Sequence, residues 1–378
     1  MKVVLIGPFP PLRGGISMFN HSLSNEFEKN HEVFRISFSL QYPKFLFPGK
    51  SQYSEFAGKP AEKLVNSINP LTWSKTAKRI DDIKPDLIIF QYWHPFFSLA
   101  YSSIAKKIKK SLKTKIIINC NNINPHEPNF FDKHLTKKFF KYGDYFVTMS
   151  QTVKKALLQI DPHAKFIESK HPIYDIFGDP IKKDIARQNL SLSKEFNEKI
   201  ILYFGLIREY KGLDILIKAA QELKKKISNF KIVVAGECYG KEAKYLTLAK
   251  KLNVKDCFDF RFEFVKDQHV SSYFCSSDVV VLPYRSATQS GVIPIAYHFN
   301  IPVITTNVGG LPENVLDGQT GFICNPTPNE LSNSIVKFFS SSHGFSSSVM
   351  DFKKQFSWEI FVKNICLLYT SDAADEHG

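Results

Sequence analysis

The feature that most constrains the fold of this chain is a repeated alternation of short apolar runs with amphipathic stretches. Runs such as KIIINC (115–120) and FKIVVAG (230–236) are typical of parallel strands that are buried on both faces. The expected strands are 2–7, 86–91, 115–120, 145–149, 199–205, 230–236, 278–283 and 302–306, and the expected helices include 16–28, 72–83, 97–111, 213–227, 241–252 and 329–339. Such alternation predicts an α/β protein of doubly wound layers.

The alternating elements fall into two sets, and a chain of 378 residues is long enough for two α/β domains. The segment that joins the sets, residues 171–198, is rich in charges, contains two prolines and has few apolar pairs. We therefore predict an N-terminal domain over 1–172, a linker over 173–198, a C-terminal domain over 199–345 and a C-terminal helix over 346–365.

Two segments stand outside this pattern. Residues 41–70 contain four prolines and predict a long irregular excursion, either a functional loop or a disordered one. The segment CLLYTSDAADE (366–376) resembles the translation of a common sequencing-library adapter. We therefore expect the native sequence to end near Ile365 and the tail 366–378 to be non-native; an ordinary polar tail is the alternative.

Positive charge is concentrated in the first half of the chain. Residues 1–170 contain 26 Lys and Arg against 13 Asp and Glu, whereas residues 171–378 contain 24 against 23. A basic half points to an anionic membrane surface, a polyanionic ligand or nucleic acid, and a merely solvated basic surface is the alternative. The clusters KKIKKSLKTK (106–115) and KKFFKY (137–142) favour an anionic membrane. No nucleic-acid module is recognisable, so nucleic acid is not an expected partner.

Cysteine usage and hydropathy indicate the cellular compartment in which the protein is expected. The six cysteines occur singly and without metal-ligand spacing, which is typical of reduced thiols in a cytosolic protein. We expect no metal and no prosthetic group. No apolar run reaches the length of a spanning helix, and the apolar stretch after Lys2 is too short for a signal peptide. A cytoplasmic location, or a peripheral one at the inner face of the cell membrane, is expected.

Small and basic residues follow several expected strands, at the sheet edge where α/β proteins bind ligands. Gly14 and Gly15 lie between the first strand and a helix, so a ligand could approach the backbone at a helix N-terminus. In FGLIREYKG (204–212), Arg208 and Lys211 occupy the turn after a strand, as a diphosphate clamp would require. An ordinary turn and a pair of solvated cations are the respective alternatives.

The stretch YRSATQSG (284–291) follows another expected strand and contains no carboxylate. Ser290, Gly291 and Val292 begin an expected helix at about 290–299, and their backbone N–H groups could hold an anion. The alternative is a helix capped by Thr288 or Ser290. Histidines also follow strands in the first half, namely His94 and, beside Glu127, His126, although a lone histidine is more often structural.

Taken jointly, these motifs resemble the family 4 retaining glycosyltransferases of the GT-B fold. The segments that resemble the C-terminal half are GLIREYKG, VVAGE, VVVLPYRSATQSGVIPIAYHFNIPVITTNVGGLPE and DGQTGF, and those that resemble the N-terminal, acceptor-side half are GPFPPLRGGISMF and NNINPHE. The resemblance spans roughly residues 1–365. It implies two Rossmann-like domains that face a central cleft, bind a nucleotide-diphosphate sugar and transfer the sugar with retention of anomeric configuration.

The resemblance also implies roles for individual residues. Arg208 and Lys211 would hold the donor diphosphate and stabilise the leaving group, a term that is often large in catalysis. Gly15, next to Gly14, would approach the diphosphate from the other domain. His126 matches the active-site histidine near the donor sugar. The remaining donor-binding candidates are Ser290, Gly291 and Val292 through their backbone, and Glu237 near the nucleotide.

The chain departs from the family where two glutamates eight residues apart usually read the donor sugar and the ribose. Those positions fall on Ala287 and Ile295, neither of which can accept a hydrogen bond from a hydroxyl. Thr288 and Gln289 are the substitute candidates. The resemblance implies a front-face mechanism, in which a donor phosphate oxygen takes the acceptor proton and no catalytic base is named.

The expected function is transfer of a sugar to a glycan or lipid-linked acceptor, in the assembly of cell-surface polysaccharide or lipopolysaccharide. Two alternatives are a non-hydrolysing nucleotide-sugar 2-epimerase of the same fold and an inactive relative that binds polyanions or membranes. An epimerase would need carboxylates and a histidine around the sugar, and residues 285–299 supply no acid. The donor sugar, the base, the acceptor, the linkage and the oligomeric state have no readable code in the sequence.

Overall fold

The computed structural model divides the chain into two compact units. The N-terminal unit comprises Met1–Pro172 and Phe356–Gly378, and the C-terminal unit comprises Ile173–Gln355. The structure describes all residues except 45–46, 48–50, 57, 126–128, 175, 193–197 and 376–378, and for 370–375 it describes the backbone only.

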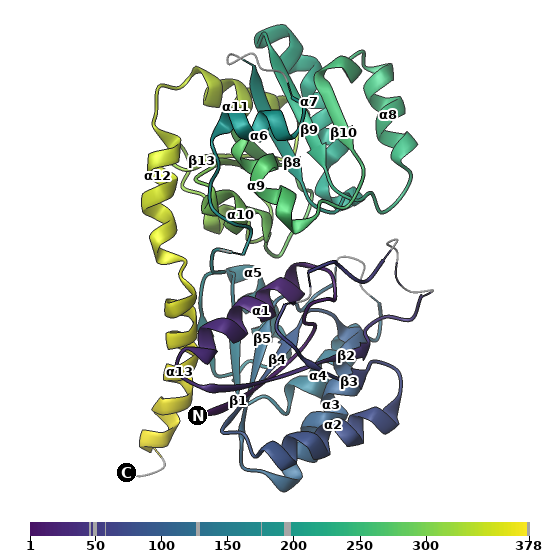
Figure 1. The fold of residues 1–378 in the computed structure, drawn as a ribbon, viewed down its shortest axis with the longest axis vertical. Coiled ribbons are helices and arrows are strands. Elements are labelled where there is room, and N and C mark those ends of the chain that lie inside the picture. Colours follow the sequence, from purple (N-terminus) through teal and green to yellow (C-terminus); the bar gives the residue numbers. More distant parts are fainter. Residues whose placement is uncertain are drawn as a thin grey trace. The chain divides into compact units, whose positions relative to one another are not determined.

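The described part of the N-terminal unit is built on a seven-stranded parallel sheet of order β3-β2-β1-β4-β5-β6-β7 (Figure 1). Its strands are β1 (Lys2–Ile6), β2 (Glu32–Leu40), β3 (Glu62–Asn66), β4 (Leu87–Tyr92), β5 (Lys115–Cys120), β6 (Tyr145–Thr148) and β7 (Phe166–Glu168). The helices are α1 (Gly15–Glu28), α2 (Pro70–Ile83), α3 (Ser98–Ser111), α4 (Asp132–Phe140), α5 (Gln151–Ile160) and α13 (Trp358–Asp375), with the 3-10 turn η2 (Pro95–Phe97). The strand order reverses direction between β1 and β4, which makes this pair the switch point of the sheet.

The C-terminal unit repeats this plan with a six-stranded parallel sheet of order β10-β9-β8-β11-β12-β13 in its described residues. Its strands are β8 (Lys199–Phe204), β9 (Phe230–Ala235), β10 (Phe258–Arg261), β11 (Val279–Leu282), β12 (Val303–Thr306) and β13 (Gly321–Cys324). The helices are α6 (Lys183–Asn189), α7 (Leu213–Lys226), α8 (Glu242–Lys251), α9 (Asp267–Cys275), α10 (Val292–His298), α11 (Pro328–Ser340) and α12 (Phe345–Phe352), with the 3-10 turns η3 (Glu209–Lys211), η4 (Lys255–Cys257), η5 (Pro312–Asn314) and η6 (Lys353–Gln355). Its switch point lies between β8 and β11.

The central strands form because their β-branched residues pack well between two helical layers. Every residue of β4 is buried, and so is every residue of β11. Side chains of the preceding residues cap several helices: Asn69 accepts the N–H of Leu71 in α2, and Thr327 accepts that of Glu330 in α11. Each of these two helices also has a proline in its first turn, where the missing N–H has no cost.

The predicted fold class is confirmed, and the eight predicted strands are present to within one residue at each end. Five strands were not predicted: β2, β3, β7, β10 and β13. The segment 41–70 is not irregular throughout, because β3 lies within it and α2 begins at its last residue. The predicted linker 173–198 groups with the C-terminal unit, as do residues 346–355, whereas α13 belongs to the N-terminal unit.

Helix α13 packs against α1 in the N-terminal unit, as the yellow and purple helices in Figure 1 show. The ring of Phe19 in α1 lies 5.0 Å from that of Trp358 and 5.5 Å from that of Phe361. Phe19 and Phe361 are each only 1% exposed. The last helix of the chain therefore completes the core of its first domain. Whether residues 366–378 are native stays a prediction.

Candidate functional site

The loops that follow β8 and β11 meet at the switch point of the C-terminal unit. Because parallel strands end at the same edge of a sheet, the residues after Phe204 and after Leu282 are neighbours. The first loop carries Arg208 and Lys211, and the second is the stretch YRSATQSG. The fold therefore places the turn that carries Arg208 and Lys211 next to the stretch YRSATQSG.

Glycines set the shape of the first loop. Gly205 adopts a φ of +100° and Gly212 a φ of +66°, conformations that side chains disfavour. A Cβ on Gly212 would lie only 1.9 Å from the carbonyl oxygen of Pro283. The end of the first loop thus packs directly on the start of the second, and only glycine fits at this contact.

Arg285 fastens the two loops to each other. Its backbone N–H donates to the carbonyl of Tyr210 at 2.7 Å, and its guanidinium donates to the carbonyl of Glu209 at 3.0 Å. The guanidinium also donates to both carboxylate oxygens of Asp214 in α7, at 2.8 and 2.6 Å. Burial opposes ionisation of Asp214, but Arg285 outweighs it and holds the pKa of that carboxyl below its ordinary value. This clamp positions the turn that carries Lys211, and it was not predicted from the sequence.

Lys211 points back toward the end of β8. A Cβ built on Gly205 would lie 3.5 Å from Lys211 Nζ and 3.6 Å from Val292 Cγ2, so the ammonium group lies close to the start of α10. Its Nζ lies 5.3 Å from the ring centre of Tyr284. Burial lowers the pKa of Lys211; Tyr210 opposes this shift and the positive charge of Arg208 adds to it.

Arg208 occupies the same turn as Lys211 and is held by an aromatic ring. Its guanidinium carbon lies 5.0 Å from the ring centre of Tyr239. Both cations are only partly exposed to solvent. Two adjacent cations at a sheet edge that also offers a helix start form a site suited to a diphosphate.

The stretch YRSATQSG forms a turn that leads into α10. The helix begins at Val292, with Gly291 at its cap position, rather than at about residue 290. The N–H of Val292 donates to the Ser290 hydroxyl at 3.3 Å, and the hydroxyl of Tyr284 lies 3.5 Å from the same oxygen. Ser290 therefore holds one of the N–H groups that was predicted to bind phosphate. The phosphate-binding role of residues 290–292 stays a prediction.

The backbone at Ala287, the position where the family that the sequence resembles has its first glutamate, is packed tightly. A Cβ on Gly309, which has a φ of +54°, would lie 1.5 Å from the carbonyl oxygen of Ala287. The side chains of Ala287 and Ile295 are both buried. Thr288 and Gln289 are half-buried in the same turn, and their role in sugar and ribose recognition stays a prediction.

Glu237 lies at the same sheet edge, after β9. Its carbonyl accepts the N–H of Ile207 at 2.9 Å, and the residue is 4% exposed. A Cβ on the preceding Gly236 would lie 2.1 Å from the carbonyl oxygen of Gly205, so the ends of β8 and β9 are in close contact. The structure thus places Glu237 beside the loop that carries Arg208.

The candidates of the N-terminal unit follow β1 and β4 at its own switch point. Gly14 caps α1 with a φ of +121°, and a Cβ on Gly14 or Gly15 would meet no atom within 4 Å. His94 has a local structural role, because its Nδ1 accepts the N–H of Phe96 at 3.1 Å at the start of η2. His126 and Glu127 lie outside the described residues, so their predicted placement is not tested.

Each of the two basic clusters, 106–115 and 137–142, has members that are buried or paired within the N-terminal unit. Phe139 and Phe140 are buried in the core at 0% and 2% exposure, so these two aromatic residues of 137–142 do not face solvent. Phe130 and Phe131, just before α4, are instead 94% and 68% exposed. In the cluster 106–115, Lys109 is paired with Asp144 at 2.5 Å. The exposed aromatic residues next to the lysines of α4 are therefore Phe130 and Phe131, and contact of this region with a membrane stays a prediction.

Two features are absent from the residues that the structure describes. No group of three or more His, Cys, Asp or Glu side chains in these parts of the chain is arranged to hold a metal ion. No helix among the described residues is both long enough and apolar enough to cross a bilayer.

Two Rossmann-like units with these switch-point loops define the GT-B fold, as was predicted. The chain aligns over 98% of its length with the whole of HepE from Anabaena, solved in complex with UDP, at a TM-score of 0.75 and 17% identity. At that identity the likeness shows the fold alone.

Comparison of sequences shows what the C-terminal part of the chain is similar to. Residues 184–355 match the family model of glycosyl transferases group 1. Spore coat protein SA of Bacillus subtilis is 23% identical over 98% of this chain and 99% of its own length. An uncharacterized glycosyltransferase of Methanocaldococcus jannaschii is 27% identical over 61% of this chain and 62% of the relative. The chain matches less than two thirds of the length of the first curated relatives. These findings support a transferase that carries a glycosyltransferase domain of the GT-B type.

Proposed function

We propose that this protein is a family 4 retaining glycosyltransferase that moves a sugar from a nucleotide-diphosphate sugar to a glycan or lipid-linked acceptor. The observation that carries the proposal is the convergence of Lys211 on Gly205 and the start of α10, with Arg208 in the same turn. A diphosphate is the part of the donor that such a site would bind. Assembly of cell-surface polysaccharide or lipopolysaccharide is the proposed setting.

In the proposed reaction, the bond between the anomeric carbon and the donor phosphate breaks while the acceptor hydroxyl forms a bond to the same face of that carbon. The hydroxyl proton passes to an oxygen of the departing phosphate. Lys211 and Arg208 stabilise the negative charge that develops on the leaving diphosphate. Gly15 would approach the donor diphosphate. In support of this role, neither its φ nor its packing against the described residues of its own unit requires a residue without a side chain.

A panel of nucleotide-diphosphate sugars, incubated with the purified protein, tests the proposal. We expect release of the nucleoside diphosphate with one or a few donors, and NMR of the product should show the anomeric configuration of the donor. Conversion of the donor to its 2-epimer would favour the epimerase instead. A protein that binds donors but turns over none of them would be an inactive relative.

We also propose that the N-terminal unit contacts an anionic membrane. Support comes from Phe130 and Phe131, whose rings are exposed and lie 5.4 Å apart, next to the exposed lysines of α4 and its C-cap. Those lysines are Lys133, Lys137, Lys138 and Lys141. Exposed aromatic residues beside lysines are typical of surfaces that insert at the lipid interface, and each lysine contributes about 1 kcal/mol at an anionic surface.

Replacement of both Phe130 and Phe131 by serine should lower binding to phosphatidylglycerol-containing vesicles about ten-fold, because two aromatic side chains no longer insert. Co-sedimentation with vesicles measures this effect. Leu71→Ser, which changes another exposed apolar residue of the same unit at 75% exposure, is the matched control and should bind like the wild type. Binding that is independent of anionic lipid, or equal in the double variant and the wild type, contradicts the proposal.

A further inference from the structure

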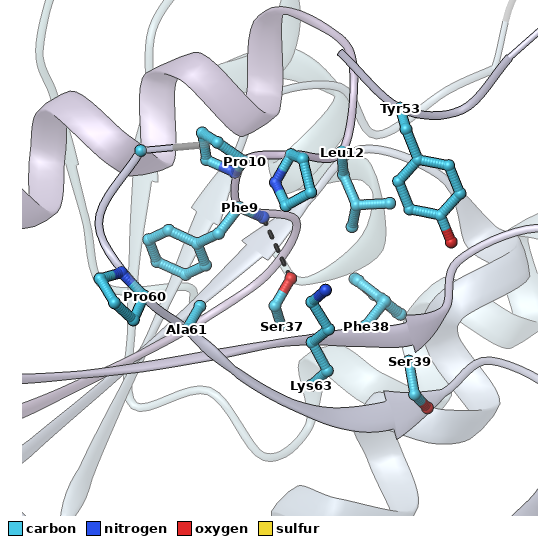
Figure 2. A pocket seen from close by; sticks show the side chains of 12 residues that line it. Phe9, Pro10, Leu12, Ser37, Phe38, Ser39, Tyr53, Pro60, Ala61 and Lys63 are labelled. Carbon is cyan, nitrogen blue, oxygen red and sulfur yellow. Dashed lines mark hydrogen bonds between the residues drawn. The ribbon is translucent and has the colours of Figure 1, made fainter. Parts of the chain in front are cut away.

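A pocket of about 310 Å³ lies within the N-terminal unit. Figure 2 shows that three segments line it: the loop after β1, the end of β2, and the segment that leads into β3. Phe9 and Leu12 come from the first segment, Phe38 from the second, and Tyr53 and Lys63 from the third. Its size is at the lower end of the range for small-molecule sites.

Backbone hydrogen bonds hold the third segment against the first. Arg13 donates its N–H to the carbonyl of Gln52 at 2.8 Å, and Ser54 donates its N–H to the carbonyl of Pro11 at 2.8 Å. Gly58 packs so closely on Pro10 that a Cβ there would lie 3.0 Å from Pro10 Cβ. Two main-chain hydrogen bonds therefore fix the third segment of the pocket wall against the first.

The described residues that line the pocket are mainly apolar and include one positively charged side chain. Phe9, Leu12 and Phe38 are at most 5% exposed, and the hydroxyl of Ser37 already accepts the N–H of Phe9 at 3.2 Å. Lys63 is the one charged residue among the described lining residues, and it makes no ion pair with any residue that the structure describes. Figure 2 shows its ammonium end directed into the space framed by Ser37, Phe38 and Leu12.

We propose that this pocket binds an alkyl phosphate, with the alkyl chain against Leu12 and Phe38 and the phosphate at Lys63. An apolar wall with a single cation suits an amphiphilic anion, because the chain removes apolar surface from water while the charge is paired at the rim. A bare sugar would need several hydrogen-bonding groups to orient it, and these walls offer few.

The place of the pocket in the fold points to an acceptor subsite. Leu12, which lines the pocket, is two residues from Gly14 in the same loop, and Gly14 and Gly15 are the predicted approach to the donor diphosphate. A ligand in the pocket thus contacts the loop that would touch the donor. This assignment of the alkyl phosphate to a lipid-linked acceptor rests on the proposed function, whereas the binding itself does not.

Binding of three probes to the full chain, measured by isothermal titration calorimetry, tests the proposal. The probes are hexyl phosphate, hexyl β-glucoside and inorganic phosphate. We expect saturable binding of hexyl phosphate that Lys63→Met weakens about five- to ten-fold, the loss of one charge-assisted contact. Ala61→Leu, which fills the pocket, should weaken it at least as much. Lys75→Met, at an exposed lysine of α2, is the matched control and should bind like the wild type.

Each other result overturns part or all of the inference. Equal binding of hexyl β-glucoside and hexyl phosphate, unaffected by Lys63→Met, would show that no anion is recognised. Equal affinity for inorganic phosphate and hexyl phosphate would show that the apolar wall does not contribute to binding of the alkyl chain. Absence of hexyl phosphate binding overturns the pocket assignment even if the donor panel gives turnover. Binding without turnover of any donor leaves the site in place and overturns the acceptor role.

Discussion

Lys211→Met should lower the release of nucleoside diphosphate from the donor by about 10²–10³-fold, the loss typical of removing one donor that stabilises a developing negative charge. Methionine keeps an unbranched apolar stem of similar length, so the half-buried chain can still pack while the ammonium is lost. Steady-state release of the nucleoside diphosphate, with the best donor of the panel, measures the effect.

Lys251→Met is the control for this variant, because Lys251 is an exposed lysine at the end of α8. It should turn over the donor at the wild-type rate, and circular dichroism should show that both variants are folded. Turnover of Lys211→Met within about three-fold of wild type would remove this lysine from the mechanism, since such a change is under 1 kcal/mol.

The pH dependence of turnover provides a second readout of Lys211. Burial lowers its pKa, so the ammonium is lost at a lower pH than for an ordinary lysine. Activity should therefore fall on the alkaline side earlier than an exposed lysine would allow. Lys211→Arg should move that fall to higher pH, because a guanidinium stays charged throughout this range.

Gly309→Ala should produce the second large effect, a loss of about 3 kcal/mol or more in the free energy of unfolding, because two penalties act together. The residue has a φ of +54°, and its Cβ would lie 1.5 Å from the carbonyl oxygen of Ala287. The backbone of the YRSATQSG turn would have to move. In a unit of this size, such a loss lowers the unfolding temperature by roughly 6–12 °C.

Gly318→Ala separates these two penalties. Gly318 has a φ of +74° in the same unit, but a Cβ there would meet nothing within 4 Å. This control should lose only the conformational term of about 1 kcal/mol, roughly 2–4 °C. Calorimetry of both variants measures the difference. Equal losses in the two variants would mean that the turn at Ala287 can yield to an added methyl group.

The parts of the fold that could be predicted are those whose burial shows directly in the residue types. β5 was predicted to the residue because KIIINC is mainly apolar, and every residue after its first is buried. β2 was missed because EVFRISFSL contains polar residues that the structure buries: Arg35 is 9% exposed and pairs with Glu28 at 2.5 Å and with Ser24 Oγ at 2.9 Å. An arginine that is buried through its ion pair with the preceding helix has no signature within the strand itself.

The same division applies to the candidate site. Arg208 and Lys211 could be placed at a sheet edge because they directly follow a recognisable strand. The clamp between Arg285 and Asp214 joins residues 71 positions apart, and neither partner is unusual in its own segment. The hydrogen bond from Val292 to Ser290 depends on where α10 begins, and the boundaries of elements are what a single sequence defines least well.

The contact of α13 with α1 has a consequence for the order in which the protein is made. Synthesis proceeds from the N-terminus, and domains usually fold as they emerge. Here the first domain emerges without the partner of Phe19, since Trp358 and Phe361 are translated only after the whole second domain. The first domain therefore emerges with part of its apolar core uncovered, and α13 can cover that core only after the second domain has been synthesised.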